Sequence, residues 1–224
     1  MEESKTNEKY EGRRKDWLAS TITFFLQGLE CHYDIDYHNP ERLLELKDEG
    51  FILLPKHQRM LDIMLEGLML REVLHKNGSY IMKSTLPGLM EYLGGIPIKR
   101  AKDILLRSDD REIRKREIEE AREIRDRAEN MVAGLIAHKE IIVFHPEGTR
   151  NYKARGDIPQ PNLDSLIRIQ KKVGYQIPFV PLDIDYKTES VFDPEVDLIV
   201  GRPIRTSSAD ELRAHLSREI KLLH

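Results

Sequence analysis

The sequence predicts an α/β fold: a single domain with a mixed, mostly parallel sheet flanked by helices. Short apolar runs that suit buried strands recur along the chain. Between these runs, apolar residues repeat at helical spacing, which indicates that strands and helices alternate. A length of 224 residues fits one domain. We place that domain at residues 31–224, after an N-terminal segment at 1–30.

Seven segments predict strands. In the first, Cys31 to Tyr37, large apolar or aromatic residues alternate with other residues. A second, short strand is expected after Gly94 and Gly95. The other five are short apolar runs: Phe51–Leu54, Tyr80–Met82, Ile141–Phe144, Phe179–Leu182 and Leu198–Val200. Pro178 and Pro181 interrupt strand pairing, so the segment Ile177–Leu182 is expected at an edge of the sheet.

Five segments predict helices: Leu43–Lys47, Leu61–Leu74, Asp110–His138, Asp164–Lys172 and about Ser208–Leu223. The longest one places an apolar series at helical spacing: Ile113, Ile118, Ala121, Ile124, Ala128, Met131 and Leu135. Its charges form acid-to-base pairs four residues apart, which is typical of a solvated face rather than a binding site. The proline-rich stretch Ile158–Pro161 is expected to be a loop before the fourth helix.

Composition excludes several classes of protein. Hydrophobic residues make up 40% and charged residues 33%, which argues against a disordered chain and against several membrane-spanning helices. The net charge of -3 provides no overall basic field for nucleic acid, so we expect no nucleic-acid partner. With Cys31 as its single cysteine, the sequence cannot form a disulfide framework or supply zinc-finger ligands.

The N-terminal segment raises the question of membrane contact. It is polar up to the cluster Arg13-Arg14-Lys15, and the thirteen residues from Trp17 to Leu29 carry no charge. That length is short of the roughly 20 residues that span a bilayer. One interpretation is an amphipathic helix packed on the domain. The other is a helix that lies on a membrane surface, with the basic cluster beside it.

A histidine and an aspartate mark the first candidate site. His57 follows the apolar run Phe51–Leu54, and Asp62 lies five residues later, where a helix is expected to begin. If His57 precedes that helix, Asp62 can reach back to it, because helical side chains lean toward the N-terminus. The carboxylate would then orient the imidazole, and His57 would act as a general base. A loop histidine with an unrelated aspartate would give the same spacing.

Two further segments could bind an anion. Directly after the run Ile141–Phe144 comes His145-Pro146-Glu147-Gly148-Thr149-Arg150, which offers a flexible turn, a hydroxyl and a guanidinium suited to phosphate. The segment Gly94–Arg100 places Arg100 after a predicted strand, where ligands of α/β sheets collect. Ordinary turns with solvated basic residues would give the same two patterns.

Taken together, these segments resemble the glycerolipid acyltransferase family, in particular 1-acyl-sn-glycerol-3-phosphate acyltransferases. His57 and Asp62 resemble the family's N-H-x4-D motif, and Gly94–Arg100 resembles G-x-I-x-I-x-R. Pro146–Arg150 matches five of the six positions of F-P-E-G-T-R, and Ile177–Leu182 resembles the family's V-P strand. The resemblance runs from about Ile52 to Leu182.

The resemblance implies transfer of a fatty acyl group from acyl-CoA or acyl carrier protein to the hydroxyl of a lysophospholipid. Lysophosphatidic acid, converted to phosphatidic acid, is the expected acceptor. The resemblance further implies that His57 removes the hydroxyl proton and that Asp62 orients His57. Residues expected to bind the acceptor's polar head are Arg100, Glu147, Gly148, Thr149 and Arg150. No cofactor and no metal are expected.

Several residues depart from the family pattern. Lys56 stands where Asn is usual, Lys99 where Asp is common, and His145 where Phe is expected. The segment Asn151–Leu163 also fits poorly, so another lysolipid or a lyso-aminolipid stays an alternative acceptor. Remoter alternatives are a non-catalytic lipid-binding or phosphate-binding module and a thioesterase. Because the expected substrates are amphiphiles, we expect a cytoplasmic protein bound peripherally to the inner face of the membrane.

Overall fold

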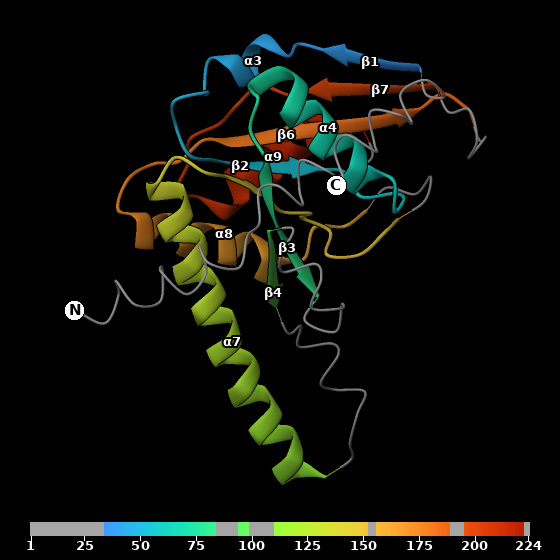
Figure 1. Cartoon of the computed structure of the whole chain (residues 1–224). Helices are drawn as coiled ribbons and strands as arrows, with labels where there is room; N and C mark the ends of the chain where they lie inside the picture. The colour runs from blue at the N-terminus through green and yellow to red at the C-terminus, as the bar shows by residue number, and fades with distance from the viewer. Residues whose placement is uncertain (1–33, 84–93, 99–109, 152–155, 189–194, 222–224) are drawn as a thin grey trace.

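The structure is a computed structural model that describes residues 34–83, 94–98, 110–151, 156–188 and 195–221. Strands and helices alternate in these ranges (Figure 1). The strands are β1 (Asp34–His38), β2 (Phe51–Pro55), β3 (Gly78–Lys83), β4 (Gly95–Ile98), β5 (Ile141–Val143), β6 (Phe179–Tyr186) and β7 (Glu195–Val200). The helices are α3 (Glu41–Leu44), α4 (Asp62–Leu74), α7 (Arg111–Ala137), α8 (Gln160–Val173) and α9 (Ala209–Glu219).

One seven-stranded sheet organises the described residues, in the order β1-β7-β6-β2-β5-β3-β4. The pair β6–β7 is antiparallel, and every other neighbouring pair is parallel. The predicted class, an α/β domain with a mixed, mostly parallel sheet, is therefore confirmed. Because β2 is parallel to both β5 and β6, the carboxyl ends of these three central strands meet at one edge.

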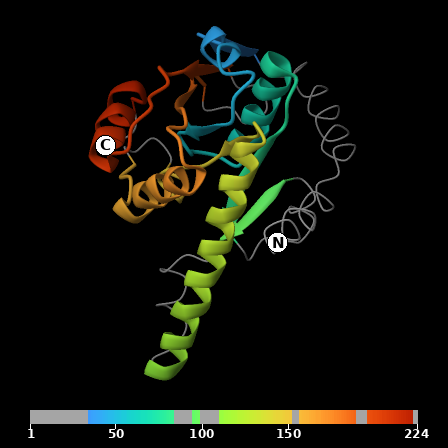
Figure 2. The same ribbon diagram turned by 90° about the vertical axis from the view of Figure 1, so that its left-hand side faces the viewer.

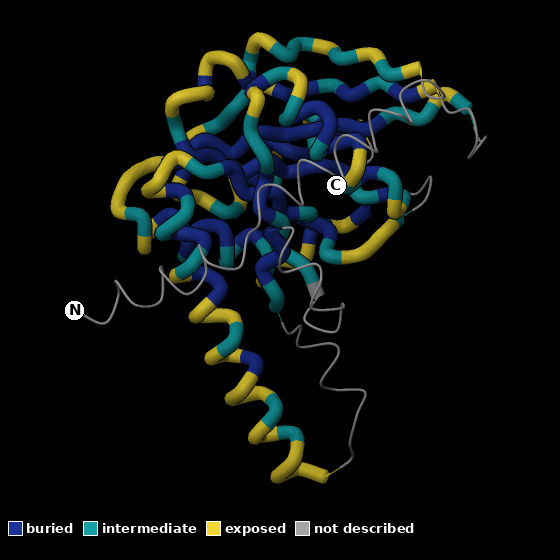
Figure 3. The backbone as a smooth tube through the Cα atoms, viewed as in Figure 1, coloured by how far each residue is buried: buried dark blue, intermediate teal, exposed yellow. Residues whose placement is uncertain are grey.

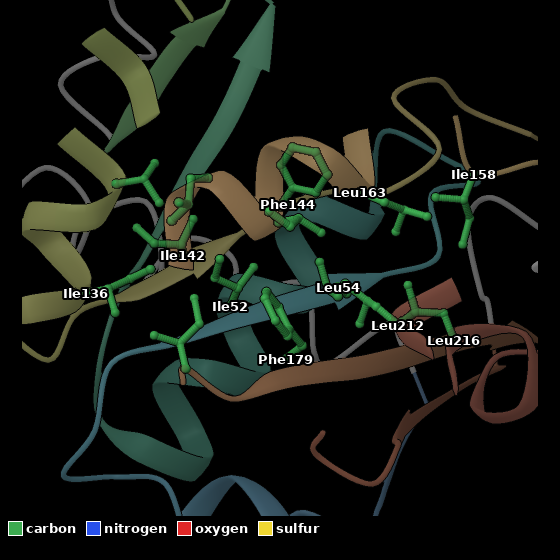
Figure 4. Close-up of a cluster of buried hydrophobic side chains, with 14 of the residues drawn as sticks. Ile52, Leu54, Ile136, Ile142, Phe144, Ile158, Leu163, Phe179, Leu212 and Leu216 are labelled. Carbon is green, nitrogen blue, oxygen red and sulfur yellow. The ribbon is translucent and has the colours of Figure 1, made fainter. Parts of the chain in front are cut away.

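Alternate residues of β2 supply the two halves of the core. Ile52 and Leu54 face a cluster completed by α7, α8 and α9, part of which is shown in Figure 4. Phe51 and Leu53 face the opposite cluster, to which α3 and α4 contribute. All four side chains are fully buried, as expected for a strand covered on both faces. Figure 3 shows the buried backbone concentrated along the sheet.

The prediction of an edge strand at Ile177–Leu182 is wrong, because β6 lies between β2 and β7. The sheet tolerates Pro181 for a local reason. Its carbonyl accepts a hydrogen bond from the backbone N–H of Gly201, beyond the last registered pair of the two strands, Leu182 and Val200. In an extended strand, the N–H and C=O of one residue point to the same side. The backbone N–H that Pro181 lacks would therefore point toward β7 beyond the last registered β6–β7 pair, so its absence removes no hydrogen bond from the registered ladder.

Two helix predictions need smaller corrections. The first predicted helix, Leu43–Lys47, is the short helix α3, which begins earlier and ends at Leu44 before a turn. The helix α8 begins at Gln160, so half of the expected proline-rich loop is helical. Pro161 fits there because the first turn of a helix needs no backbone N–H from it.

The helix α7 is only partly packed on the domain. Its first half extends away from the sheet, and its second half lies along it (Figure 2). Val132 and Ile136 are fully buried in the second half, whereas Ile113 and Ile118 in the first half are 47% and 37% exposed. The predicted apolar face therefore forms a core contact only toward the C-terminal end of the helix. Asp110 caps the helix by accepting hydrogen bonds from the backbone N–H groups of Glu112 and Ile113.

Several predictions lie outside the described residues. These are the helix at 17–29, the basic cluster at 13–15, and the two residues Lys99 and Arg100. Among the helices that the structure does describe, none is both long enough and apolar enough to cross a membrane.

Candidate active site

Two loops at the carboxyl edge of the sheet bring the predicted motifs together. The first loop leaves β2 after Pro55 and leads into α4, and the second leaves β5 after Val143. Because β2 and β5 are parallel neighbours, both loops emerge at the same edge. The backbone N–H of Asn151 donates to the carbonyl of His57 at 3.0 Å, which joins the two loops directly. The strand β4 also has its carboxyl end, Ile98, at this edge.

His57 and Asp62 are in contact. The Nδ1 atom of His57 lies 3.1 Å from Oδ2 of Asp62, which is the first residue of α4. The side chain of Asp62 is fully buried, and that of His57 is 13% exposed. An ionised carboxylate only accepts hydrogen bonds, so Nδ1 carries the hydrogen in this pair. The Nε2 atom is then left as the basic nitrogen, the arrangement that a general base requires.

Asp62 is itself held by donors on both oxygens. Its Oδ2 also accepts from the backbone N–H groups of Gln58 and Arg59, at 2.5 Å and 2.7 Å. Its Oδ1 accepts from the hydroxyl of Tyr186 at 2.6 Å. Burial, followed by the nearby Asp62 carboxylate, raises the pKa of Tyr186, so this hydroxyl keeps its proton and remains a donor. The carboxylate therefore has a fixed orientation before any substrate binds.

The sequence interpretation missed Tyr186. It is the last residue of β6, and the guanidinium of Arg59 lies over its ring, 4.1 Å from the ring centroid. The parallel pairing of β6 with β2 delivers it to the same edge as His57. No spacing in the sequence points to this residue, because 124 positions separate it from Asp62. Only its place at the end of a central strand could have suggested it.

Glu147 is tied into the protein by an ion pair. The Nζ atom of Lys56 donates to its two carboxylate oxygens at 2.8 Å and 2.7 Å, and both side chains are fully buried. The backbone N–H of His57 and the side-chain amide of Asn151 also donate to Glu147. Both oxygens are thus engaged by donors of the protein. Direct contact between Glu147 and an acceptor head group stays a prediction.

The end of the second loop is open to solvent. Gly148 turns the chain at a φ of 64°, a conformation that favours glycine, and its N–H donates to the carbonyl of His145. Thr149 and Arg150 follow and are exposed. Among the described residues, no ion pair or hydrogen bond engages the Arg150 side chain. The structure therefore leaves this guanidinium accessible to an anionic ligand.

Within the part of the chain that the structure describes, no group of three His, Cys, Asp or Glu side chains is arranged to hold a metal ion. The polar groups beside His57 instead form pairs: Asp62 with His57, Lys56 with Glu147, and Glu66 with His145.

The two loops at this edge lie within a region that matches a known protein family. Residues 34–185 match the family model described as Acyltransferase, a range that covers more than half of the chain and includes both loops. The chain belongs to the acyltransferase family. His57 and Asp62 of the acyltransferase both lie within the matched range.

A solved structure shows the same fold. The acyltransferase is similar to the crystal structure of the 1-acyl-sn-glycerophosphate (LPA) acyltransferase PlsC from Thermotoga maritima, with a TM-score of 0.57 and 20% sequence identity. The match covers 92% of this chain and 78% of the Thermotoga maritima chain. A search of curated proteins gave no match. At this level of identity, the structural likeness establishes the fold.

Proposed function

We propose that the acyltransferase moves a fatty acyl group from a thioester, acyl-CoA or acyl carrier protein, to the hydroxyl of lysophosphatidic acid. The contact between His57 and Asp62 at the carboxyl edge of the sheet carries this proposal. Family membership supports acyl transfer. The exposed Arg150 supports an anionic acceptor, because a guanidinium suits phosphate oxygens. The acceptor named for the Thermotoga maritima enzyme agrees with this choice.

In the proposed mechanism, Nε2 of His57 removes the proton of the acceptor hydroxyl while its oxygen attacks the thioester carbonyl carbon. Asp62 stabilises the imidazolium that forms and keeps its own negative charge. The tetrahedral intermediate then collapses: the C–S bond breaks, and His57 returns the proton to the thiolate. The products are the acylated lipid and a free thiol, and no acyl group is attached to the protein.

The acceptor's head group is placed by the second loop in this proposal. Thr149 offers a hydroxyl and Arg150 a guanidinium beside the turn at Gly148, and Arg100 is proposed to contribute from the segment after β4. Glu147 acts mainly through Lys56, by holding the two loops together. Direct binding of the head group by Glu147 remains part of the proposal inherited from the family resemblance.

Release of free thiol tests the proposed reaction. The wild-type protein, supplied with acyl-CoA or acyl carrier protein and lysophosphatidic acid, should release thiol and form phosphatidic acid that mass spectrometry detects. His57→Ala should abolish both. No turnover with any lysolipid would contradict the proposal.

A different lysolipid or a lyso-aminolipid is the second candidate acceptor. The segment Asn151–Leu163 departs from the family pattern directly after Arg150, and it favours a changed head-group site. A panel of acceptors with the same donor separates the two candidates. A strong preference for an acceptor without phosphate would exclude lysophosphatidic acid as the main substrate.

We also propose that the acyltransferase works on the cytoplasmic membrane surface, because its lipid substrates reside there. The uncharged segment at 17–29 would lie in the interface, beside the basic cluster Arg13-Arg14-Lys15. Replacing these three residues with glutamate should weaken sedimentation with vesicles that contain an anionic phospholipid. Unchanged sedimentation would refute the role of the cluster.

A further inference from the structure

A second histidine–carboxyl pair lies against His57. The Nε2 atom of His145 is 3.0 Å from Oε1 of Glu66, which extends from α4. The ring centroids of His145 and His57 are 4.1 Å apart, with the ring planes inclined by 34°. His145 stands where the family usually has phenylalanine, so the pair is a departure of this chain. Neither residue has a role in the proposed mechanism above.

The surroundings of Glu66 favour its uncharged form. Its side chain is fully buried, and within the described residues its Oε2 has no hydrogen-bond partner. A carboxylate in this position would hold a charged oxygen away from any donor. Burial and then the Asp62 carboxylate raise the pKa of Glu66 well above its usual value, although the nearby His57 acts in the opposite direction. A protonated Glu66 can instead donate a hydrogen bond to Nε2 of His145.

Tyr80 is a further ionisable group near Glu66. Burial raises the pKa of Tyr80, so its phenol is uncharged. Its hydroxyl donates to the backbone carbonyl of Ile63 at 3.2 Å rather than to Glu66. Tyr80 therefore supplies no charge that would favour a carboxylate at Glu66.

His145 is neutral as well. Burial lowers its pKa to about 4, although the carboxylates of Asp62 and Glu147 act in the opposite direction. When Nε2 accepts a hydrogen bond from Glu66, the hydrogen of the neutral ring must be on Nδ1. The pair is then a neutral hydrogen-bonded unit with one defined tautomer.

We propose that His145, oriented by an uncharged Glu66, is a positioning residue for the His57 ring. This inference rests on the proposed acyl transfer by His57. Asp62 contacts the His57 ring at one atom, Nδ1, and this single contact does not fix the orientation of the ring plane. His145 covers one face of the ring and restricts this orientation. A neutral ring also suits the imidazolium that forms on His57, because an aromatic face attracts a cation.

Steady-state kinetics with acyl-CoA and lysophosphatidic acid test the positioning role. His145→Ala should lower kcat by about 10- to 100-fold with a smaller change in KM, as expected when a catalytic group is misplaced. His145→Phe keeps a flat neutral ring and should recover most of the loss. Wild-type kcat together with a wild-type pH profile in His145→Ala would overturn the proposal.

Substitutions of Glu66 test its charge. Glu66→Leu removes the hydrogen bond to His145 and should lower kcat, whereas Glu66→Gln keeps a donor at this position and should recover most of that activity. Glu72→Gln, an exposed change on the same helix, is the matched control. If Glu66→Gln moves the acid limb of the kcat/KM profile by about one pH unit, Glu66 is charged in the wild-type protein and the proposal fails.

Nitrogen-15 NMR of histidine-labelled protein tests the arrangement without any substrate. His145 should stay neutral between about pH 5.5 and 8, with its hydrogen on Nδ1. His145→Phe should shift the His57 ring signals. An imidazolium at His145 near neutral pH, or unchanged His57 signals, would overturn the inference. If the wild-type protein acylates no lysolipid, the proposed function fails, and these spectra still decide how the rings are arranged.

Discussion

The Nζ atom of Lys56 lies 2.7 Å from Oε2 of Glu147, and both side chains are fully buried. This ion pair joins the loop that carries His57 to the loop that carries Thr149 and Arg150. The same carboxylate accepts a hydrogen bond from the backbone N–H of His57 at 3.3 Å. This chain therefore connects its two loops through a buried charged pair.

Removing one member of this ion pair should be costly. Lys56→Met leaves the Glu147 carboxylate buried without its cation, and we expect a loss of about 3–5 kcal/mol in the free energy of unfolding. The double variant Lys56→Met/Glu147→Gln should lose less than the two single variants combined, because it removes both charges. Denaturant titration measures these values. Additive losses would show that the two side chains do not interact.

An exposed ion pair provides the control for this measurement. Arg205 lies 2.6 Å from Glu49, and both side chains are well exposed. Arg205→Met should therefore cost less than about 1 kcal/mol in the same titration. An equal loss at both sites would contradict the importance of burial at Lys56.

Tyr186→Phe should lower kcat by about 10-fold. The substitution removes the hydroxyl that donates to Oδ1 of Asp62, and a hydrogen bond to a charged group is worth about 1.5–3 kcal/mol. KM should change little, since Tyr186 is proposed to act through Asp62 rather than on the substrate. Tyr175→Phe applies the same chemical change to an exposed tyrosine and is the control. A wild-type kcat in Tyr186→Phe would contradict a role for this hydrogen bond.

Arg150→Ala should raise KM for lysophosphatidic acid by about 10- to 100-fold, with a smaller effect on kcat. The exposed guanidinium is proposed to bind the acceptor's phosphate through charge-assisted hydrogen bonds, which contribute about 1.5–3 kcal/mol. Arg150→Lys keeps the positive charge but loses the planar guanidinium, so its KM should lie between those of the wild-type protein and Arg150→Ala. Arg122→Ala, an exposed change on α7, is the control. An unchanged KM would place the head group elsewhere.

The low pKa of His145 should be visible in the pH dependence of stability. The ordinary value is 6.5 and the folded value is about 4, so between them the unfolded chain binds a proton that the folded protein does not. This residue therefore destabilises the fold as the pH falls through that window. The raised pKa of Glu66 has the opposite sign, because the folded protein then binds the extra proton.

A Glu66→Gln background isolates the contribution of His145. In that background, adding His145→Phe should make the protein progressively more stable relative to its parent as the pH falls from 6.5 toward 4. The difference in the free energy of unfolding between the two proteins should grow by up to about 1.4 kcal/mol for each pH unit. Denaturant titration at several pH values measures it. A stability difference that does not change with pH would show that the pKa of His145 is not lowered.

The sequence predicts the sheet and the first motif well, because both depend on local patterns. Wholly apolar runs such as Phe51–Leu54 indicate strands buried on both faces. The spacing of His57 and Asp62 at a strand-to-helix junction allows their contact, the family resemblance implies it, and the structure shows it at 3.1 Å. The place of Pro181 could not be predicted, since its tolerance depends on where the pairing with β7 ends.

The surroundings of the site depend on contacts between distant segments. Tyr186 donates to Asp62 across 124 positions, and Lys56 reaches Glu147 across 91 positions. No periodicity links such residues, and only the parallel order of β2, β5 and β6 brings them to one edge. The exposure of Ile113 could not be predicted either. Apolar periodicity shows which face of α7 is apolar, but not how much of the helix packs against the rest of the domain.

The most direct test of the proposed function is the release of free thiol from acyl-CoA in the presence of lysophosphatidic acid, with mass detection of the lipid product. The wild-type protein should release one thiol for each phosphatidic acid formed, and His57→Ala should release none above background while keeping the wild-type unfolding transition. A folded His57→Ala variant with wild-type turnover would contradict the assignment of His57 as the general base.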